Sequence, residues 1–242
     1  MDILNEYTAL AEFAENCKKS YLSVYEERKE TAGKIVYSSG GQGVHRGYYC
    51  PSPTVDVVSG NAGRGKLLAR LTSKSKPSYK YYFDNNSRLT AVDNFTELGK
   101  NTELIYADGV FEKSIEFNDS GEIILLSQCR FSDGKIISYH KFAYSGMFSV
   151  HSIDDIPYMD FTGEEYAYGE FGLNRVDVHT YMSMPRNMFS DGMKISKHFA
   201  AEFTHDDEGF LSAYRYIEYG NNEKTEEIIH MRDFDVKLKR KV

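Results

Sequence analysis

The segment Phe131-Ser132-Asp133-Gly134-Lys135-Ile136-Ile137-Ser138-Tyr139-His140 is repeated as Phe189-Ser190-Asp191-Gly192-Met193-Lys194-Ile195-Ser196-Lys197-His198. Seven of the ten positions are identical in the two copies. An Asp-Gly pair between apolar runs favours the positive backbone dihedrals of a tight hairpin turn. Each copy therefore predicts a strand, a turn and a second strand, and the repetition predicts related hairpins in two parts of the chain.

Further turn signals surround the two copies. Tyr106-Ala107-Asp108-Gly109 is a fainter version of the Asp-Gly signal. A second type of turn, in which polar residues follow an aromatic residue, occurs at residues 83–89, 117–123 and 203–210. The polar residues turn the chain, and the flanking aromatic and aliphatic residues can pair across the two strands. Successive hairpins of this kind predict a long antiparallel meander.

Hydrophobic periodicity supports the same prediction. From about Tyr48 onward the apolar residues recur with a period of two, which is the period of a β-strand. Residues 175–184 and 234–242 have one apolar and one polar face, whereas residues 123–131 are apolar on both faces, as is typical of a covered strand. The 19 tyrosines and 15 phenylalanines suit the half-buried surfaces of a sheet.

The N-terminus is the one strongly helical segment. Apolar residues recur at alternating steps of four and three from Ile3 to Tyr21 and Val24, and Gly33 supplies a stop signal. This stripe favours a helix within residues 1–33 that packs on the sheet, with a partner-binding coiled coil as the alternative. We expect a mainly β protein, α+β at the N-terminus, whose residues 34–242 form one antiparallel meander. Two β subdomains are the alternative.

Composition limits the class of partner. The chain has 29 basic and 36 acidic residues and a formal net charge of −7, which disfavours nucleic acid because phosphate recognition needs a basic surface. The start of the chain lacks the features of a signal peptide, and no apolar run is long enough to span a membrane. We therefore expect a cytoplasmic protein. Cys17, Cys50 and Cys129 are few and widely spaced, which favours reduced thiols over disulfides or zinc ligands.

One motif invites a nucleotide-binding interpretation. Gly60-Asn61-Ala62-Gly63-Arg64-Gly65-Lys66 has the glycine and lysine spacing of a phosphate-binding loop. However, Leu67 stands where a serine or threonine would hold magnesium, and the surrounding chain lacks the strand-helix units of a nucleotide-binding fold. A glycine-rich turn is therefore the favoured interpretation.

The repeated histidines invite a catalytic or metal-binding interpretation. Ser138 and His140, like Ser196 and His198, are two residues apart and therefore share one face of a strand. Duplication explains the repetition more simply, because ligand identity without convergent geometry is a weak signal. We predict no catalytic residue, no metal site and no cofactor.

Residues 151–192 favour protein recognition. This segment holds eight acidic residues against Arg175 and Arg186, a net charge of −6 out of the −7 of the whole chain. The acids would attract a basic protein, and the interleaved aromatic side chains would supply contact area. A solvated acidic surface beside ordinary sheet aromatics is the alternative. The candidate partner-binding residues are Asp154, Asp155, Tyr158, Asp160, Glu164, Glu165, Tyr166, Tyr168 and Glu170.

The hairpin repeats resemble those of YD-repeat shells and the MORN-variant repeats of bacterial proteins. Phe131-Ser132-Asp133-Gly134-Lys135-Ile136 carries this resemblance most clearly, and it extends over residues 79–146 and 189–219. The irregular spacing departs from both families. The resemblance implies a β scaffold of the kind found around bacterial toxins and their neutralisation, with no enzymatic reaction.

Three hypotheses of function follow. The first is a non-enzymatic protein-binding protein, specifically a bacterial immunity protein that neutralises a basic toxin through the acidic aromatic surface. The second is a structural or assembly scaffold that presents its hairpins as a broad surface. The third, which ranks last, is a nucleotide- or metal-dependent enzyme. The oligomeric state does not follow from the sequence.

Overall fold

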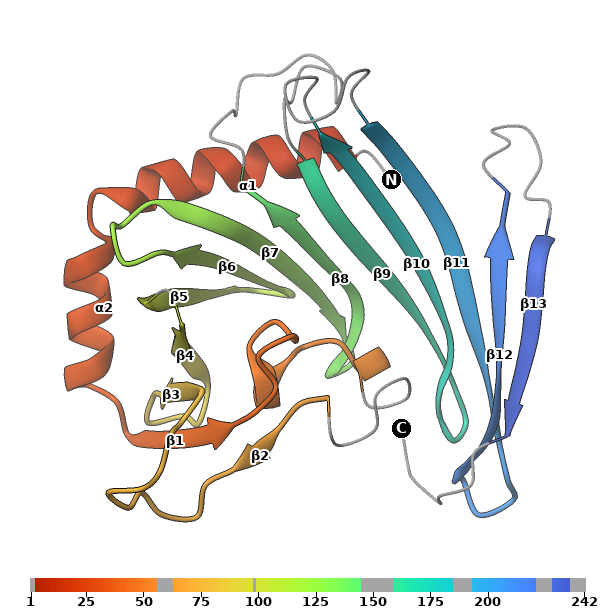
Figure 1. Cartoon of the computed structure of the whole chain (residues 1–242), viewed down its shortest axis with the longest axis horizontal. Helices are drawn as coiled ribbons and strands as arrows, with labels where there is room; N and C mark the ends of the chain where they lie inside the picture. Colours follow the sequence, from red (N-terminus) through yellow and green to blue (C-terminus); the bar gives the residue numbers. More distant parts are fainter. Residues whose placement is uncertain are drawn as a thin grey trace. The chain divides into compact units, whose positions relative to one another are not determined.

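The computed structural model describes residues 3–55, 63–97, 99–144, 159–184, 193–220 and 228–235. The described strands form a 13-stranded antiparallel sheet in which neighbours in the sheet, from β3 to β13, are also neighbours in the chain (Figure 1). At the other end of the sheet, β1 lies between β3 and β2. The prediction of a mainly β protein built as an antiparallel meander is confirmed.

The strands vary in length from two to thirteen residues. The first seven are β1 (Lys34–Ser39), β2 (Lys66–Leu67), β3 (Tyr79–Phe83), β4 (Leu89–Thr96), β5 (Gly99–Asp108), β6 (Phe111–Phe117) and β7 (Ile123–Ser132). The others are β8 (Lys135–Ala143), β9 (Met159–Gly169), β10 (Gly172–Met184), β11 (Met193–His205), β12 (Leu211–Tyr219) and β13 (Ile228–Asp235). The strands predicted at 123–131 and 175–184 lie within β7 and β10. Of the strand predicted at 234–242, residues 236–242 lie outside the described residues.

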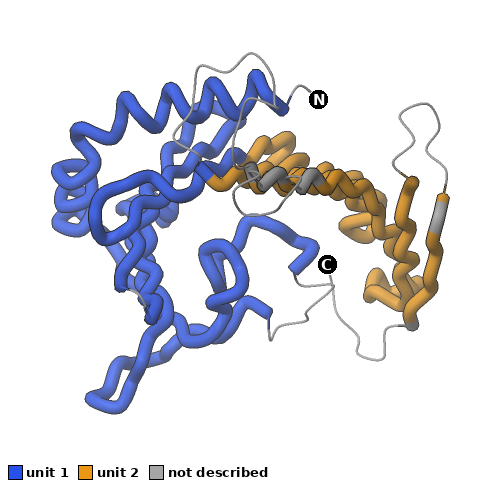
Figure 2. Tube along the Cα trace, turned by 45° about the horizontal axis from the view of Figure 1, so that its top comes forward, with its two compact units in different colours: residues 1–128, 144–153 blue, residues 129–143, 154–242 orange. Residues whose placement is uncertain are grey.

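The chain divides into two compact units (Figure 2). Unit 1 comprises residues 1–128 and 144–153, and unit 2 comprises residues 129–143 and 154–242. Each unit has fully buried apolar side chains of its own, such as Leu104 and Phe117 in unit 1 and Phe142 and Leu173 in unit 2. The boundary between the units falls within β7, inside the range 34–242 for which the sequence predicts one meander.

The helix expected within residues 1–33 consists of two helices, α1 (Ile3–Lys18) and α2 (Tyr21–Glu30), which run in different directions (Figure 1). At the break the Ser20 hydroxyl donates to the Cys17 carbonyl at 3.2 Å, a local bond that competes with helix propagation. The predicted stripe is correct along α1, where Tyr7, Leu10 and Ala14 are buried. It is wrong at its end: the buried residue of α2 is Tyr25 rather than Val24, because the break shifts the stripe.

The two helices cover one face of the sheet in unit 1. Their contacts include the stacked rings of Tyr21 and Phe117, with centroids 4.4 Å apart, and the perpendicular rings of Tyr25 and Tyr82 at 6.1 Å. None of the described helices is long and apolar enough to cross a membrane. The N-terminal segment therefore packs on the sheet, as its apolar stripe predicts.

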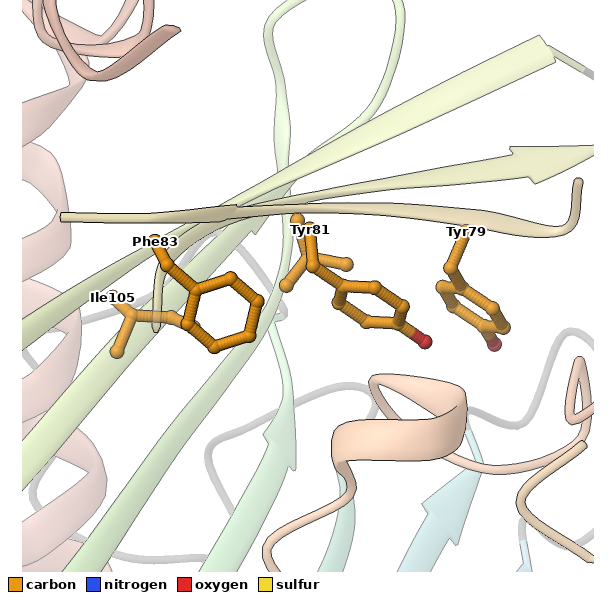
Figure 3. Packing of buried hydrophobic residues seen from close by; sticks show 5 residues of the cluster. Tyr79, Tyr81, Phe83 and Ile105 are labelled. Carbon is orange, nitrogen blue, oxygen red and sulfur yellow. The ribbon is translucent and has the colours of Figure 1, made fainter. Parts of the chain in front are cut away.

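The opposite face of unit 1 is covered by residues 41–52, here called the strap, which contain a 3-10 helix, η1 (Gly47–Tyr49). Beneath it lies a cluster of buried side chains from neighbouring strands, Tyr79, Tyr81, Phe83, Val92 and Ile105. The rings of this cluster project from the same face of the sheet (Figure 3). The Tyr79 hydroxyl donates to the carbonyls of Gly41 and Val44, and the Tyr81 hydroxyl to that of Arg46, at 3.0–3.1 Å.

Arg64 shows what the described part of the glycine-rich loop does. Its guanidinium donates to three carbonyls of the strap, those of Tyr48, Cys50 and Ser52. Residues 60–62 of the predicted loop lie outside the described residues. The described portion of the motif thus binds the protein's own backbone, which agrees with a structural turn.

The turns that follow aromatic residues share one hydrogen-bond pattern. The Asp84 carboxylate accepts the backbone amides of the residues two and four positions ahead, both at 2.8 Å. Asn118 and Asp206 accept the equivalent amides at 2.9–3.0 Å. At the third position ahead, φ is positive in all three turns, with 62° at Ser87, 77° at Gly121 and 79° at Gly209. The three turns are therefore the same structure.

The Asp-Gly turns have the conformation that their sequence predicts. Asp133 and Gly134 have φ values of 51° and 75°, and Gly109 has a φ of 61°. The turn of the second copy, at residues 189–192, lies outside the described residues. In the described part of the chain, short motifs with Asp, Asn or Gly therefore form the turns between strands of the meander.

Ser87 occupies a left-handed position where the two equivalent turns have glycine. Ser87→Gly is expected to raise the free energy of unfolding by about 0.5–1 kcal/mol, because glycine adopts this conformation without a steric penalty. Urea unfolding would measure the change. Ser120→Gly is the matched control, since Ser120 is exposed in the equivalent Asn118 turn without a positive φ. A loss of stability in both variants would contradict the prediction.

Candidate functional site

The structure divides the predicted partner-binding residues among several places. Asp154, Asp155 and Tyr158 lie outside the described residues. Along β9, consecutive side chains point to opposite faces of the sheet. Asp160, Glu164, Tyr166 and Tyr168 therefore share one face, Glu165 lies on the other, and Glu170 lies in the turn after the strand.

Three of these residues are bound within the sheet. Tyr166 is buried and its hydroxyl donates to Glu164 Oε2 at 2.8 Å. On the opposite face, Glu165 Oε1 lies 3.1 Å from His140 Nε2. Their roles are at least partly structural, so the candidates best placed for a partner are those nearest the turn, Tyr168 and Glu170.

Three turns of unit 2 lie at one end of its strands: 133–134, 170–171 and 206–210. The register pairs Ser138 with Glu165 and Arg175 with Glu202, so that β8 begins, β9 ends, β10 begins and β11 ends at this end. The β9–β10 and β11–β12 turns can be followed there in Figure 1. We call these turns, together with Tyr168, the acidic hairpin end.

The acidic hairpin end combines carboxylates with aromatic rings. Its acidic residues are Asp133, Glu170, Asp206, Asp207 and Glu208, and Lys135, beside the first turn, has its Nζ 5.0 Å from the centre of the Tyr168 ring. Phe171 is 47% exposed, and its ring centre lies 6.5 Å from that of His205 in the neighbouring hairpin. Phe171 thus links the two turns and still offers apolar surface.

A second polar cluster lies on one face of unit 2. The register places His140, His179, His198 and Tyr219 in one row across β8, β10, β11 and β12, with Gly163 of β9 between the first two. The rings of His179 and His198 stack with centroids 4.1 Å apart, and those of His198 and Tyr219 at 4.4 Å. The repeated histidines therefore face the same side of the sheet.

Arg175 holds this cluster together. Its guanidinium donates to both Asp177 oxygens at 2.6 and 2.8 Å, to Glu202 at 2.7 Å and to the Tyr219 hydroxyl at 2.9 Å. The bond to Asp177 raises the pKa of Arg175 above its usual range. Burial raises the pKa of Asp177, but Arg175, together with His198 at 3.5 Å, outweighs burial and lowers it. Sequence reasoning counted Arg175 and Asp177 only as charges.

Two histidines of the row each lie beside a carboxylate: His140 beside Glu165 and His198 beside Asp177. A carboxylate can orient an imidazole for proton transfer. His140 is 4% exposed, so its ring is buried, whereas the His198 and Asp177 side chains are partly exposed. Among the described residues, no three or more His, Cys, Asp or Glu side chains are arranged to hold a metal ion. The geometry supports cross-strand pairing as the role of the row.

A third cluster, which sequence reasoning missed, lies beneath the strap in unit 1. Glu103 of β5 and Glu116 of β6 are directly opposite in the register and are 4% and 8% exposed. Arg46 of the strap donates through Nε to Glu103 at 2.8 Å and through a terminal nitrogen to Glu112 at 2.6 Å. Arg46 itself has a left-handed φ of 59°, a conformation that is unfavourable for a residue other than glycine.

The two facing carboxyl groups have pKa values displaced in opposite directions. Burial raises the pKa of Glu103, but the charges of Arg46 and His45 outweigh burial and hold it well below its usual range. For Glu116, burial and then the charge of Glu103 raise the pKa. Asn101 donates to Glu116 at 3.0 Å, which offsets part of this shift. Ionisation of Glu103 therefore favours a protonated Glu116.

No protein family model and no curated protein sequence matches the chain. The resemblance of residues 131–136 to YD-repeat and MORN-variant hairpins stays an expectation. A function is therefore inferred from the geometry of the acidic hairpin end, the histidine row and the buried glutamates beneath the strap.

Proposed function

We propose that the chain is a non-enzymatic protein-binding protein whose acidic hairpin end takes a basic protein partner. The observation that carries this proposal is that three turns with five carboxylates and one lysine lie at the same end of the strands of unit 2, where Phe171 is half exposed. Carboxylates at a rim accelerate encounter with a basic surface, and an aromatic side chain supplies the apolar anchor. The other two clusters are engaged in contacts within the protein.

The biological form that we propose is a bacterial immunity protein. Exposed turns with a net negative charge can bind in the basic groove of a toxin domain, where the toxin would otherwise hold an anionic substrate. The hairpin resemblance of residues 131–136 supports this choice, and Tyr168 and Glu170 retain the recognition role expected of them. The whole-chain charge of −7 suits the same class of partner.

Neutralising the acidic hairpin end is expected to slow association with the partner. The partner would first be isolated by pull-down with the full chain and identified by mass spectrometry. A variant carrying Glu170→Gln, Asp207→Asn and Glu208→Gln is then expected to associate about tenfold more slowly at low salt, with a smaller difference at high salt. Phe171→Ala is expected mainly to raise the dissociation rate, by about tenfold. Surface plasmon resonance would measure both rates.

The control removes the same number of charges elsewhere. Glu27, Glu30 and Glu97 are exposed in unit 1, and their triple replacement by glutamine should leave the association rate within about twofold. Equal slowing by both triple variants would show that net charge alone steers binding. Unchanged rates in the hairpin-end variants would place the partner on another surface and refute the proposal.

A further inference from the structure

The buried carboxyl pair beneath the strap is positioned to respond to pH. Among the described residues, the titratable groups that act on Glu116 are His45 from the strap, Glu103 from β5 and Tyr79 from β3, and Arg46 of the strap bonds Glu103 and Glu112. The neutral partners are Asn94 and Asn101. One buried arginine therefore bonds two carboxyl groups, and one of these, Glu103, lies directly opposite the third, Glu116.

Arg46 and its neighbours connect this cluster to the strap. The Arg46 side chain is 2% exposed and belongs to the strap, whereas its acidic partners belong to the sheet. The adjacent backbone depends on the same arrangement, since the Arg46 carbonyl accepts from the Tyr81 hydroxyl and the Tyr48 amide donates to that hydroxyl at 3.1 Å. A change of charge in the carboxyl pair therefore acts directly on the strap.

We propose that Glu103 and Glu116 hold one proton between them and that loss of this proton loosens the strap from the sheet. With the proton on Glu116, the pair carries a single negative charge, on Glu103, which Arg46 bonds at 2.8 Å. When the proton leaves to solvent, two buried carboxylates lie directly opposite each other, and the repulsion falls on Glu103, the carboxylate that holds Arg46 and through it the strap. The device is independent of the acidic hairpin end.

The direction of the pH dependence follows from the pKa of Glu116. Because its pKa is raised in the closed structure and returns toward 4.5 when the strap opens and water enters, the protonated group favours the closed state. Opening therefore increases as pH rises above about 4.5 and levels off above the raised pKa. For one proton, the opening equilibrium constant rises at most about tenfold per pH unit.

Cys50 provides a reporter within the strap. It is a buried cysteine outside any disulfide, and Cys129, a fully buried cysteine of unit 2, reports on global unfolding. The full chain would be labelled with iodoacetamide between pH 5 and 9, and each cysteine followed by peptide mass spectrometry. For each pH, the labelling rate of Cys50 in the wild type is divided by the rate in Glu116→Gln. This ratio removes the pH dependence of thiol ionisation, which is common to both proteins. We expect this ratio to rise at least threefold with pH while the ratio for Cys129 stays constant.

A second variant separates the contribution of His45. His45→Gln should keep the pH-dependent rise relative to a variant that carries both His45→Gln and Glu116→Gln. If Glu116→Gln does not fold, the pH dependence is measured in the wild type by hydrogen exchange of the Tyr48 amide. The exchange rate is divided by the intrinsic rate at each pH and compared with that of the Leu104 amide of β5. A flat ratio or a flat normalised rate would overturn the proposal, as would a pH dependence that disappears with His45 alone.

Discussion

Arg46→Met is expected to lower the free energy of unfolding of unit 1 by about 3–5 kcal/mol. The substitution removes the guanidinium that bonds Glu103 and Glu112, so Glu103 is left charged in a buried position opposite Glu116, with His45 Nε2 3.1 Å away. Methionine keeps most of the side-chain volume and inherits the same left-handed backbone. The loss therefore measures the removal of the Arg46 ion pairs rather than a cavity.

Urea unfolding followed by tyrosine fluorescence would measure this loss. Arg88→Met is the matched control, because the Arg88 side chain is exposed and its replacement should change stability by less than about 0.5 kcal/mol. Combining Arg46→Met with Glu103→Gln should recover part of the stability, since the orphaned charge is then removed. A double variant less stable than Arg46→Met would contradict the electrostatic explanation.

Asp93→Ala is expected to cost about 3 kcal/mol and to release α2 from the sheet. Asp93 is buried and accepts the hydroxyls of Tyr25 at 2.7 Å and Tyr82 at 2.8 Å, and Lys100 lies 3.5 Å away. Burial, followed by interactions that include Asp93, raises the pKa of both tyrosines, so the phenols donate as neutral groups. Without the carboxylate, two buried hydroxyls lose their acceptor.

Hydrogen exchange distinguishes this effect from general destabilisation. The backbone amides of α2 should lose protection more than those of β5, because Tyr25 is the one buried residue of α2. Asp108→Ala is the control, since the Asp108 side chain is 77% exposed and pairs only distantly with Lys113 at 3.9 Å. Uniform loss of protection throughout unit 1 would show that Asp93 does not act through α2.

The meander could be predicted because the features that specify it are local. Asp133-Gly134 fixes its own turn through two positive dihedrals, and Asp84, Asn118 and Asp206 close theirs through hydrogen bonds to the next few amides. Such signals are fully contained within a few residues of sequence. The break between α1 and α2 is local as well, but a polar Ser20 within a periodic stripe is not by itself a stop signal.

The clusters could not be predicted, because they depend on distant pairings. Arg46 is 57 residues from Glu103 and 66 from Glu112, and its glycine-rich surroundings indicate only a loop. Charge and aromatic content predict a recognition role for residues 151–192, but the alternation of side chains along a strand places Glu164 and Glu165 on opposite faces. The gathering of Glu170 with Asp207 and Glu208 further depends on the register of three strands, which composition does not reveal.

The shared turn has a consequence for how this sheet can change in length. Each of these three turns is closed by hydrogen bonds to its own Asp or Asn side chain. A hairpin that contains such a turn therefore includes the residues that reverse the chain direction. Insertion or deletion of a whole hairpin leaves the pairing of the remaining neighbours intact, whereas a single added residue reverses the faces of a strand. Duplication can thus change the number of strands by one hairpin at a time, because each added hairpin contains the residues that form its own turn.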